Sequence, residues 1–221
     1  MLRFQKQDNC NNINNVVIRQ VSCAPTHLII ARASLEASGP GIIGALAEQI
    51  LAANPGATNE SIAYPATLDD YQDSSAQGTA AMARALTEYA GACPCARIVL
   101  LGYSQGAHVV GDALCGGGGV LGNAYTAPVE GMVGERVLAI IQMGDPRFVA
   151  GKSFDAGNST RNGLFPRPAN ISCDAYGDRI RSYCDEGDTC CAGGNNTLIH
   201  VTYLDRYTDD AVDFVNSKLA A

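Results

Sequence analysis

The segment Arg97–Leu114 restricts what this chain can fold into more than any other. Arg97–Leu101 is a short apolar run with β-branched members, which is typical of a buried strand. The sequence GYSQG follows directly at Gly102–Gly106, and Ala107–Leu114 (AHVVGDAL) has the composition of a helix. A strand, a tight turn flanked by glycines and a helix form the context in which a Gly-x-Ser-x-Gly sequence exposes its serine.

This turn predicts a nucleophile. Ser104 would lie at the tip of a sharp, strained bend, and a side chain at position 102 or 106 would crowd the neighbouring strand and helix. The backbone N–H of Gln105 would point at the same space as the serine hydroxyl and could hold a developing oxyanion. An ordinary strand-to-helix turn is the alternative interpretation. The flanking elements favour Ser104 as a catalytic nucleophile.

A serine needs a base to act as a nucleophile near neutral pH, and the chain contains three histidines. His200 is favoured, because it alone satisfies the order serine, then acid, then histidine of α/β-hydrolases. His108 lies one turn into a helix that runs away from Ser104. His27 opens a buried strand, where a structural role is expected. Both remain less favoured alternatives.

The acid that orients the base should lie between Ser104 and His200, and several carboxylates remain possible. Asp145 ends a buried strand, but the following Pro146 indicates a turn-forming role. Asp188 lies between Cys184 and Cys191, where a small disulfide loop would hold one carboxylate rigidly; its neighbours Asp185 and Glu186 would form the solvated surface of that loop. The other candidates are Asp112, Glu130, Glu135, Asp155, Asp174 and Asp178.

Composition narrows the class of protein. The chain has 221 residues, 47% of them hydrophobic and 17% charged, and a net charge of −7. These values favour one compact α/β domain at 23–221, after an Asn- and Gln-rich extension at 1–22. Without a basic patch or a long apolar run, neither nucleic acid nor membrane is an expected partner.

Nine cysteines are many for a cytosolic enzyme of this size. Their spacing makes no zinc pattern, so no metal and no cofactor are expected. A secreted, disulfide-bonded protein is the better interpretation, and we expect this chain to be a processed form with an added Met1. Possible N-glycosylation sites agree with secretion; they begin at Asn59, Asn158, Asn170 and Asn195.

Hydrophobic periodicity predicts alternating strands and helices, and therefore a parallel sheet covered on both faces. The predicted strands are 27–31, 61–64, 97–101 and 137–143. The predicted helices are 42–53, 77–90, 107–114 and 208–219, the last one capped by Thr208. Residues 147–197 show little periodicity.

The chain also resembles the cutinase and acetylxylan esterase family of secreted fungal esterases, over nearly its whole length from Ser22 to Leu219. The sequence motifs that carry the resemblance are Ser22-Cys23, Ala31-Arg32, Cys93-Pro94, Gly102–Gly106, Met143–Pro146, Arg167-Pro168, and the run from Ser182 through Asp188 and Cys190-Cys191 to His200. The resemblance implies a small lidless α/β-hydrolase, a three-layer sandwich around a five-stranded parallel sheet.

The resemblance also implies roles for individual residues. Ser104 would be the nucleophile, His200 the base and Asp188 the orienting acid, with Ser34 beside the N–H of Gln105 in the oxyanion hole; Asp145 would be structural. The implied disulfides are Cys23–Cys93, Cys115–Cys173 and Cys184–Cys190. Where acetylxylan esterases carry a further cysteine, this chain has Ser159. We expect Cys10 to pair with Cys95, which leaves one thiol over.

The substrate depends on what surrounds Ser104. The segments Thr67–Ser75 and Ala192–Thr197 are expected to form the rim, and they offer carboxylates, hydroxyls and amides. Such groups suit a hydrated polysaccharide, so removal of acetyl groups from xylan by a monomeric enzyme is favoured. Hydrolysis of cutin or other polyesters is the alternative. A binding protein on a hydrolase scaffold is a remote one, because no part of the expected catalytic pattern is missing.

Overall fold

The computed structural model describes residues 22–119, 121 and 123–221. Its centre is a parallel sheet of six strands in the order β2-β1-β3-β4-β6-β5. The strands are β1 (Thr26–Ala31), β2 (Thr58–Ser61), β3 (Arg97–Tyr103), β4 (Val137–Met143), β5 (Asp155–Ala156) and β6 (Ile180–Tyr183). The expected count was five, and the sixth strand is the two-residue β5, which pairs with β6 at one edge.

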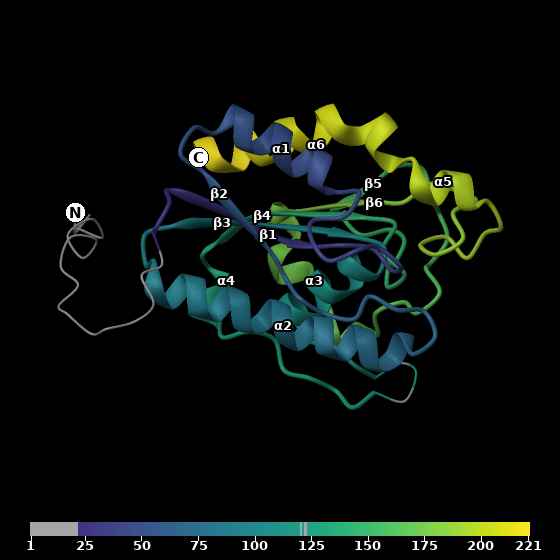
Figure 1. The fold of residues 1–221 in the computed structure, drawn as a ribbon. Helices are drawn as coiled ribbons and strands as arrows, with labels where there is room; N and C mark the ends of the chain where they lie inside the picture. The colour runs from purple at the N-terminus through teal and green to yellow at the C-terminus, as the bar shows by residue number, and fades with distance from the viewer. Residues whose placement is uncertain (1–21, 120, 122) are drawn as a thin grey trace, which may run out of the picture.

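Helices cover both faces of this sheet, as Figure 1 shows: α1 and α6 lie on one face, and α2, α3 and α4 lie on the other. The fold is therefore the expected three-layer α/β sandwich. The α-helices are α1 (Gly44–Ala53), α2 (Tyr71–Ala92), α3 (Gln105–Cys115), α4 (Gly131–Gly134), α5 (Thr197–Val201) and α6 (Tyr203–Ala220). Two 3₁₀-helices, η1 (Ala169–Ile171) and η2 (Asp174–Arg179), precede β6.

Alternation along the central strand β3 builds two separate apolar cores. Val99 and Leu101 pack with the core on the α1 and α6 side, whereas Ile98 and Leu100 pack with the core under α2 and α3. Successive side chains of a strand point to opposite faces, so a continuous apolar run is what a strand covered on both faces requires. All four of these side chains are fully buried.

Two helices, α2 and α6, begin five or six residues earlier than predicted. The α2 helix starts at Tyr71 because the side chain of Asp70 accepts a hydrogen bond from the backbone N–H of Asp73 and caps the helix. The α6 helix starts at Tyr203, so Thr208 is not its cap: the Thr208 hydroxyl donates to the carbonyl of Leu204 inside the helix. Polar residues in these first turns hid the helical pattern.

Two strands also differ from the sequence prediction. The strand expected at 61–64 is wrong by three residues, since β2 is the polar segment Thr58–Ser61 on the exposed edge of the sheet. The strand β6 lies in a region where no element was expected. Its burial comes from its position between β4 and β5, which the sequence Ile180–Tyr183 does not reveal.

The expected extension at 1–22 falls almost wholly outside the described residues, and the boundary at residue 23 stays a prediction. In the described part of the chain, no helix has the length and apolar character needed to cross a bilayer. The asparagines of all four possible glycosylation sites are exposed.

The carboxyl ends of the parallel strands bring the residues of interest to one edge of the sheet. Ser104 follows β3, Asp145 follows β4, and the segment that leads to Asp188 and His200 follows β6. In open α/β sheets, ligands bind at this edge.

Candidate active site

Ser104 occupies the strained turn that the sequence predicts. Its φ of 54° and ψ of −117° lie where non-glycine residues are rare, and it directly precedes the first residue of α3. Its N–H donates to the carbonyl of Met143 at 2.8 Å, and its carbonyl accepts from His108 at 3.1 Å. The turn is thus held by β4 on one side and by α3 on the other.

The two glycines of the motif are required by close backbone contacts. A Cβ on Gly102 would collide with the backbone of Gly106 and Ala107, and a Cβ on Gly106 would collide with the carbonyl of Ala31. The strand, the turn and the neighbouring β1 are therefore packed backbone against backbone. This packing fixes the direction in which the Ser104 side chain leaves the sheet.

His200 reaches Ser104 from the opposite end of the chain. Its Nε2 lies 2.9 Å from the Ser104 Oγ, and its carbonyl accepts from the Tyr103 hydroxyl at 2.6 Å. His200 sits on the short helix α5, which begins because the side chain of Asn196 accepts hydrogen bonds from the N–H groups of Leu198 and Ile199. One cap and one tyrosine therefore position the imidazole.

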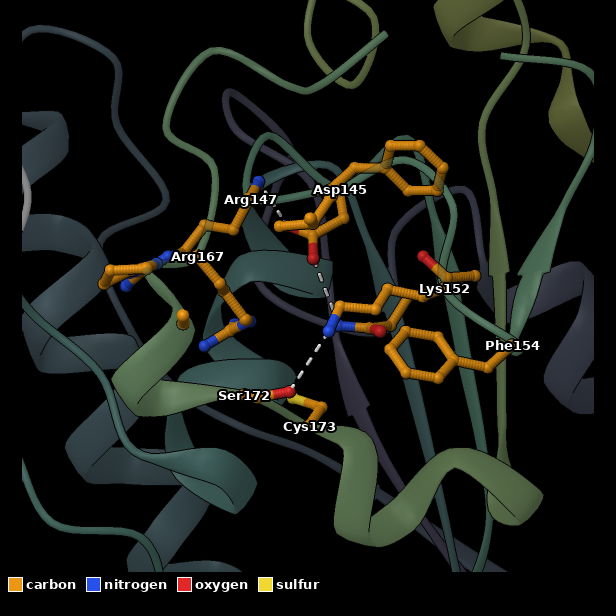
Figure 2. A pocket seen from close by; sticks show the side chains of 13 residues that line it. Asp145, Arg147, Lys152, Phe154, Arg167, Ser172 and Cys173 are labelled. Atoms are coloured by element: carbon orange, nitrogen blue, oxygen red, sulfur yellow. Dashed lines mark hydrogen bonds between the residues drawn. The ribbon is translucent and has the colours of Figure 1, made fainter. Parts of the chain in front are cut away.

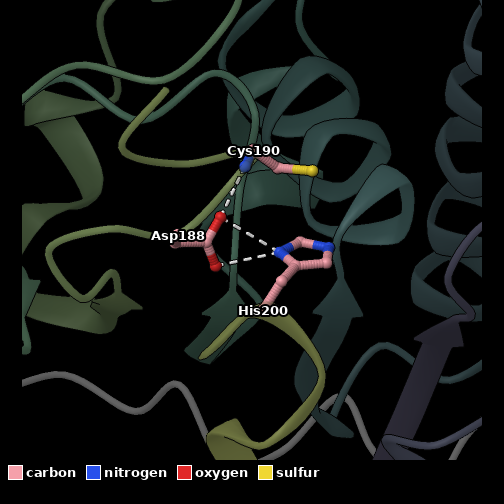
Figure 3. Close-up of side chains that lie close together, drawn as sticks. All are labelled: Asp188, Cys190 and His200. Carbon is pink, nitrogen blue, oxygen red and sulfur yellow. Dashed lines mark hydrogen bonds and ion pairs between the residues drawn. The ribbon is translucent and has the colours of Figure 1, made fainter. Parts of the chain in front are cut away.

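Asp188 completes the chain of hydrogen bonds. Its two carboxylate oxygens lie 3.1 and 2.9 Å from Nδ1 of His200 (Figure 3), whereas Ser104 contacts the other ring nitrogen, Nε2. The carboxylate is fully buried. It also accepts from the N–H groups of Cys190 and Cys191 at 2.6 and 2.8 Å, and from the Tyr203 hydroxyl at 2.8 Å.

These contacts decide the protonation of the pair. Burial alone would raise the pKa of Asp188, but the hydrogen bonds and charge of His200 and the two N–H donors outweigh burial and lower it. Burial would lower the pKa of His200, yet its contacts with Asp188 and Cys190 raise it above its ordinary value. Asp188 therefore remains ionised and supports a positive charge on the imidazole.

Ser34 and Gln105, the two residues predicted for the oxyanion hole, lie together in the corner beside Ser104. The hydroxyl of Ser34 donates to Oε1 of Gln105 at 3.0 Å, and the Gln105 side chain is fully buried. As the first residue of α3, Gln105 has a backbone N–H with no acceptor within the helix. Glu36 fixes this corner by accepting hydrogen bonds from the N–H groups of Ala33 and Ile42 at 2.6 and 2.7 Å.

The alternative bases and the rival acid lie elsewhere. His27 stacks on Tyr89, and His108 bonds to the Tyr71 hydroxyl and to Asp112. Asp145 accepts from the backbone N–H of Arg147 at 2.8 Å and from the side-chain amide of Gln142. The three side chains thus take part in packing and turn contacts.

Asp145 borders a small cavity of about 140 Å³ that is distinct from the Ser104 site (Figure 2). Three cationic side chains line it: Arg147, Arg167 and Lys152. Both arginines bind the carboxylate of Asp112, and Lys152 pairs with Asp174 at 2.9 Å. Each of these charges has a partner within the protein.

The third disulfide differs from the expected pairing. The structure contains Cys23–Cys93 and Cys115–Cys173, but Cys184 is bonded to Cys191 and not to Cys190. The Cys191 side chain points into the core with Cys184, and both are fully buried, whereas Cys190 borders the pocket of Ser104. The expected Cys10–Cys95 bridge involves a residue outside the described part of the chain.

Another prediction for the 184–191 segment also needs correction. Asp185 is buried and is not part of a solvated surface. Its carboxylate accepts from Nε of Arg206 at 2.9 Å and from the Tyr207 hydroxyl at 2.7 Å. Glu186 is exposed, as expected. The side chains of α6 therefore hold the loop from beneath, which the loop sequence alone does not indicate.

Ser104 and His200 open into a pocket of about 610 Å³ whose rim is apolar. The prediction of a polar rim formed by 67–75 and 192–197 is wrong: those segments contribute Leu68, Tyr71 and Thr197 alone. Tyr71 is the first residue of α2, and the acidic residues Asp69, Asp70 and Asp73 do not line the pocket. The exposed apolar side chains that line the pocket are Leu35, Ile42, Leu68, Leu164 and Val201.

Sequence reasoning missed the residues that support the site from behind. Tyr203 donates to Asp188, and burial raises the pKa of its hydroxyl, so the proton stays on the oxygen. Its position three residues after His200 is a signal that could have suggested this contact. Glu36 and Asn196 act through backbone N–H groups, and no spacing rule points to them.

Comparisons with known proteins identify the family of this chain. The sequence model of the cutinase family matches residues 22–219. Acetylxylan esterase 2 of Talaromyces purpureogenus is 38% identical over 92% of this chain and 90% of its own length, and Cutinase 11 of Verticillium dahliae is 38% identical over 92% and 72%.

A solved structure shows the same fold. An acetylxylan esterase superposes with a TM-score of 0.85 at 39% identity, covering 90% of this chain and all of that one. The family match includes the strained turn and the loop after β6. The chain belongs to the cutinase family and is an esterase with the α/β-hydrolase fold.

Proposed function

We propose that Ser104, His200 and Asp188 form the catalytic triad of this esterase. The observation that carries the proposal is the continuous chain of hydrogen bonds from Ser104 through His200 to the buried Asp188, which opens into the larger pocket. A hydroxyl, an imidazole and an ionised carboxylate in this order are the parts that acyl transfer requires.

The first half of the reaction uses the serine as nucleophile. The Ser104 Oγ attacks the ester carbonyl while Nε2 of His200 takes its proton. Asp188 keeps Nδ1 protonated and stabilises the imidazolium. The backbone N–H groups of Gln105 and Ser34 bind the oxyanion. His200 then gives the proton to the leaving alcohol, and an acyl-enzyme at Ser104 remains.

Water completes the reaction. His200 removes a proton from a water molecule, which attacks the acyl-enzyme and releases the acid and Ser104. We expect Ser104→Ala to lose several orders of magnitude in kcat while it keeps the unfolding free energy of the wild type within about 1 kcal/mol. Retention of more than a few per cent of the activity, measured with p-nitrophenyl acetate, would remove Ser104 from the mechanism.

The proposed substrate is acetylated xylan, hydrolysed by a secreted, monomeric enzyme. Support comes from the similarity to acetylxylan esterases in sequence and in structure. Thr189 and Thr197 line the pocket and offer hydroxyl groups for a sugar next to the reacting acetyl group. Disulfides and exposed glycosylation sequences suit an extracellular location.

One observation favours a second candidate, a cutinase-like activity on longer esters. Leu35 and Leu68, which are 74% and 54% exposed, form part of an apolar rim of the kind that binds an acyl chain or a polymer face. The relative named Cutinase 11 is as similar in sequence as the acetylxylan esterase.

A series of p-nitrophenyl esters from acetate to palmitate, run beside acetate release from acetylated xylan, separates the two. An acetylxylan esterase should lose kcat/KM steeply beyond about four carbons, since each methylene left unburied forfeits up to about 0.8 kcal/mol of binding. A maximum at medium or long chains without acetate release from xylan would make this a cutinase. In that case Leu35→Ser and Leu68→Ser should reduce hydrolysis of long esters more than that of the acetate.

A further inference from the structure

Cys190 introduces a thiol into the Ser104 pocket that the esterase mechanism does not use. Within the described residues, Cys190 is the cysteine whose thiol is free. It is half-buried and lines the pocket together with Ser104 and His200. The thiol lies beside the imidazole, so anything that it binds affects the site.

The thiol, the imidazole and the carboxylate form one cluster. The Cys190 Sγ, a ring nitrogen of His200 and a carboxylate oxygen of Asp188 lie within 4.8 Å of one another. Figure 3 shows the Cys190 side chain running alongside the imidazole ring and pointing away from Asp188. The nitrogen on that side of the ring is Nε2, because Nδ1 is hydrogen-bonded to Asp188.

We propose that the Cys190 Sγ and the His200 Nε2 bind one thiophilic divalent cation, Zn²⁺ or Cd²⁺, and that this cation reversibly blocks the active site. Thiolate and imidazole are the ligand pair that such cations prefer, whereas Mg²⁺ and Ca²⁺ select oxygen ligands. Water from the open pocket completes the coordination. The Cys190 thiol releases its proton to solvent as the metal–sulfur bond forms.

The geometry needs little adjustment. With Zn–S and Zn–N bonds of about 2.3 and 2.1 Å, tetrahedral ligand atoms lie about 3.6 Å apart. The Cys190 side chain makes only a weak 3.8 Å contact with the Thr189 hydroxyl, so rotation about its Cα–Cβ bond can bring Sγ to this distance from Nε2. Asp188 already accepts from Nδ1 of His200, and a carboxylate in this place orients a histidine toward a metal on its other nitrogen.

Inhibition follows from what the cation occupies. A metal on Nε2 takes the lone pair that accepts the proton of Ser104, so the serine is no longer activated. Inhibition rests on the proposed triad, whereas binding rests on the two ligands alone.

Binding is tested without substrate. Titration calorimetry with ZnCl₂ should give one site in the wild type and one in Ser104→Ala, and an affinity at least about tenfold weaker in Cys190→Ser, since loss of even an outer contact costs roughly 10- to 100-fold. Co²⁺ serves as a second probe, with a thiolate-to-cobalt absorption band in the wild type and in Ser104→Ala that is absent in Cys190→Ser.

Inhibition is measured with p-nitrophenyl acetate, each protein against its own metal-free rate. Zn²⁺ should inhibit the wild type, EDTA should restore it, and Cys190→Ser should need at least about ten times more Zn²⁺. Equal binding or equal inhibition in Cys190→Ser, no Zn²⁺ binding in the wild type, or the same potency for Mg²⁺ would overturn the site. Zn²⁺ binding to a wild type without esterase activity would overturn the proposed function and leave the site standing.

Discussion

The protein contains two buried pairs of a histidine and an aspartate, and they differ in their neighbours. In one pair Nδ1 of His200 lies 2.9 Å from Asp188, and in the other Nε2 of His108 lies 3.2 Å from Asp112. Both aspartates are almost inaccessible to solvent, and the pKa of each is lowered, although burial alone would raise it.

The two pairs differ in the other groups that bind each aspartate carboxylate. Asp112 accepts from Arg147 with both of its oxygens and pairs with Arg167 at 2.8 Å, so most of its charge is neutralised by guanidinium groups. Asp188 shares its charge with neutral donors and with His200 alone. Asp188 therefore has His200 as its one cationic partner, whereas Asp112 is held by two guanidinium groups.

The two histidines also differ in the partner of the ring nitrogen that does not contact the aspartate. His200 meets a serine in the strained turn at the pocket, while His108 meets the Tyr71 hydroxyl at 2.9 Å. Burial raises the pKa of Tyr71, so this phenol is a poor nucleophile. The second pair therefore joins α2 to α3 and takes no part in the proposed reaction.

The largest expected effect separates the two aspartates by activity. Asp188→Asn should lower kcat by about 10⁴-fold, because the amide leaves His200 in the wrong tautomer and its positive charge unsupported. Steady-state hydrolysis of p-nitrophenyl acetate measures this loss. The matched control is Asp112→Asn, assayed at a temperature where it is folded.

Asp112→Asn should act on stability instead. It leaves Arg147 buried without its full counter-charge, which typically costs about 3–5 kcal/mol, and urea unfolding measures the change. If the folded Asp112 variant is the inactive one and the Asp188 variant is normal, the assignment of the two pairs is reversed.

The disulfides extend the comparison to the segments that hold each aspartate. Cys184–Cys191 closes a loop of about seven residues around Asp188, and Cys115–Cys173 closes one of about 58 next to the cluster of Asp112. Loop-closure entropy predicts that replacing each pair by alanines costs about 2 and about 4 kcal/mol, respectively.

Activity should follow the opposite order. The Cys184/Cys191 double variant should lose more kcat than the Cys115/Cys173 variant, because it frees the N–H donor of Cys191 that holds Asp188. Parallel measurements of kcat and of the free energy of unfolding on both double variants test this. Full activity in the Cys184/Cys191 variant would mean that the other contacts of Asp188 suffice to hold it.

The smallest expected effect is a difference between two pH profiles. The pKa of His200 is raised, so kcat/KM should rise with pH through a value above the ordinary 6.5, as the imidazole loses its proton and becomes a base. The ion pair of His200 with Asp188 therefore stabilises the folded state fully below the unfolded pKa of about 6.5. This stabilisation is lost as the pH rises through the raised pKa of the folded state. The pKa of Asp112 is lowered, so its contribution is present above its unfolded value of about 3.9 and is lost as the pH falls further.

Between about pH 4 and 6.5 the protein should thus be folded but slow. Profiles of kcat/KM and of urea unfolding, recorded in the same buffers, test this separation. If the two curves fall together, one pair controls both properties and the contrast fails.

The sequence allowed functional residues to be predicted where the elements that position them are adjacent along the chain. Ser104 and Gln105 could be predicted because the strand, the strained turn and the helix that define them are adjacent. His200 could be reached by elimination, as the chain has few histidines. Asp188 and Ser34 came from the family resemblance, since several carboxylates fit the order of the triad equally well.

What escaped prediction depends on side-chain direction in irregular segments. Cys190 and Cys191 are neighbours that point to opposite sides, and only the turn around Asp188 decides which one meets Cys184. Leu35 and Leu164 reach the rim from loops far apart in sequence. A possible metal pair at Cys190 and His200 also escaped, because the thiol was expected in a bridge.

The two edges of the sheet have a consequence for how the protein behaves at high concentration. At one edge stands β2, whose Thr58–Ser61 backbone carries exposed polar side chains, and at the other stands β5 with two residues. Long, apolar edge strands are templates for cross-β association between molecules. Neither edge offers a second molecule a long apolar strand to extend, so the sheet can be large and almost wholly apolar inside without seeding fibrils.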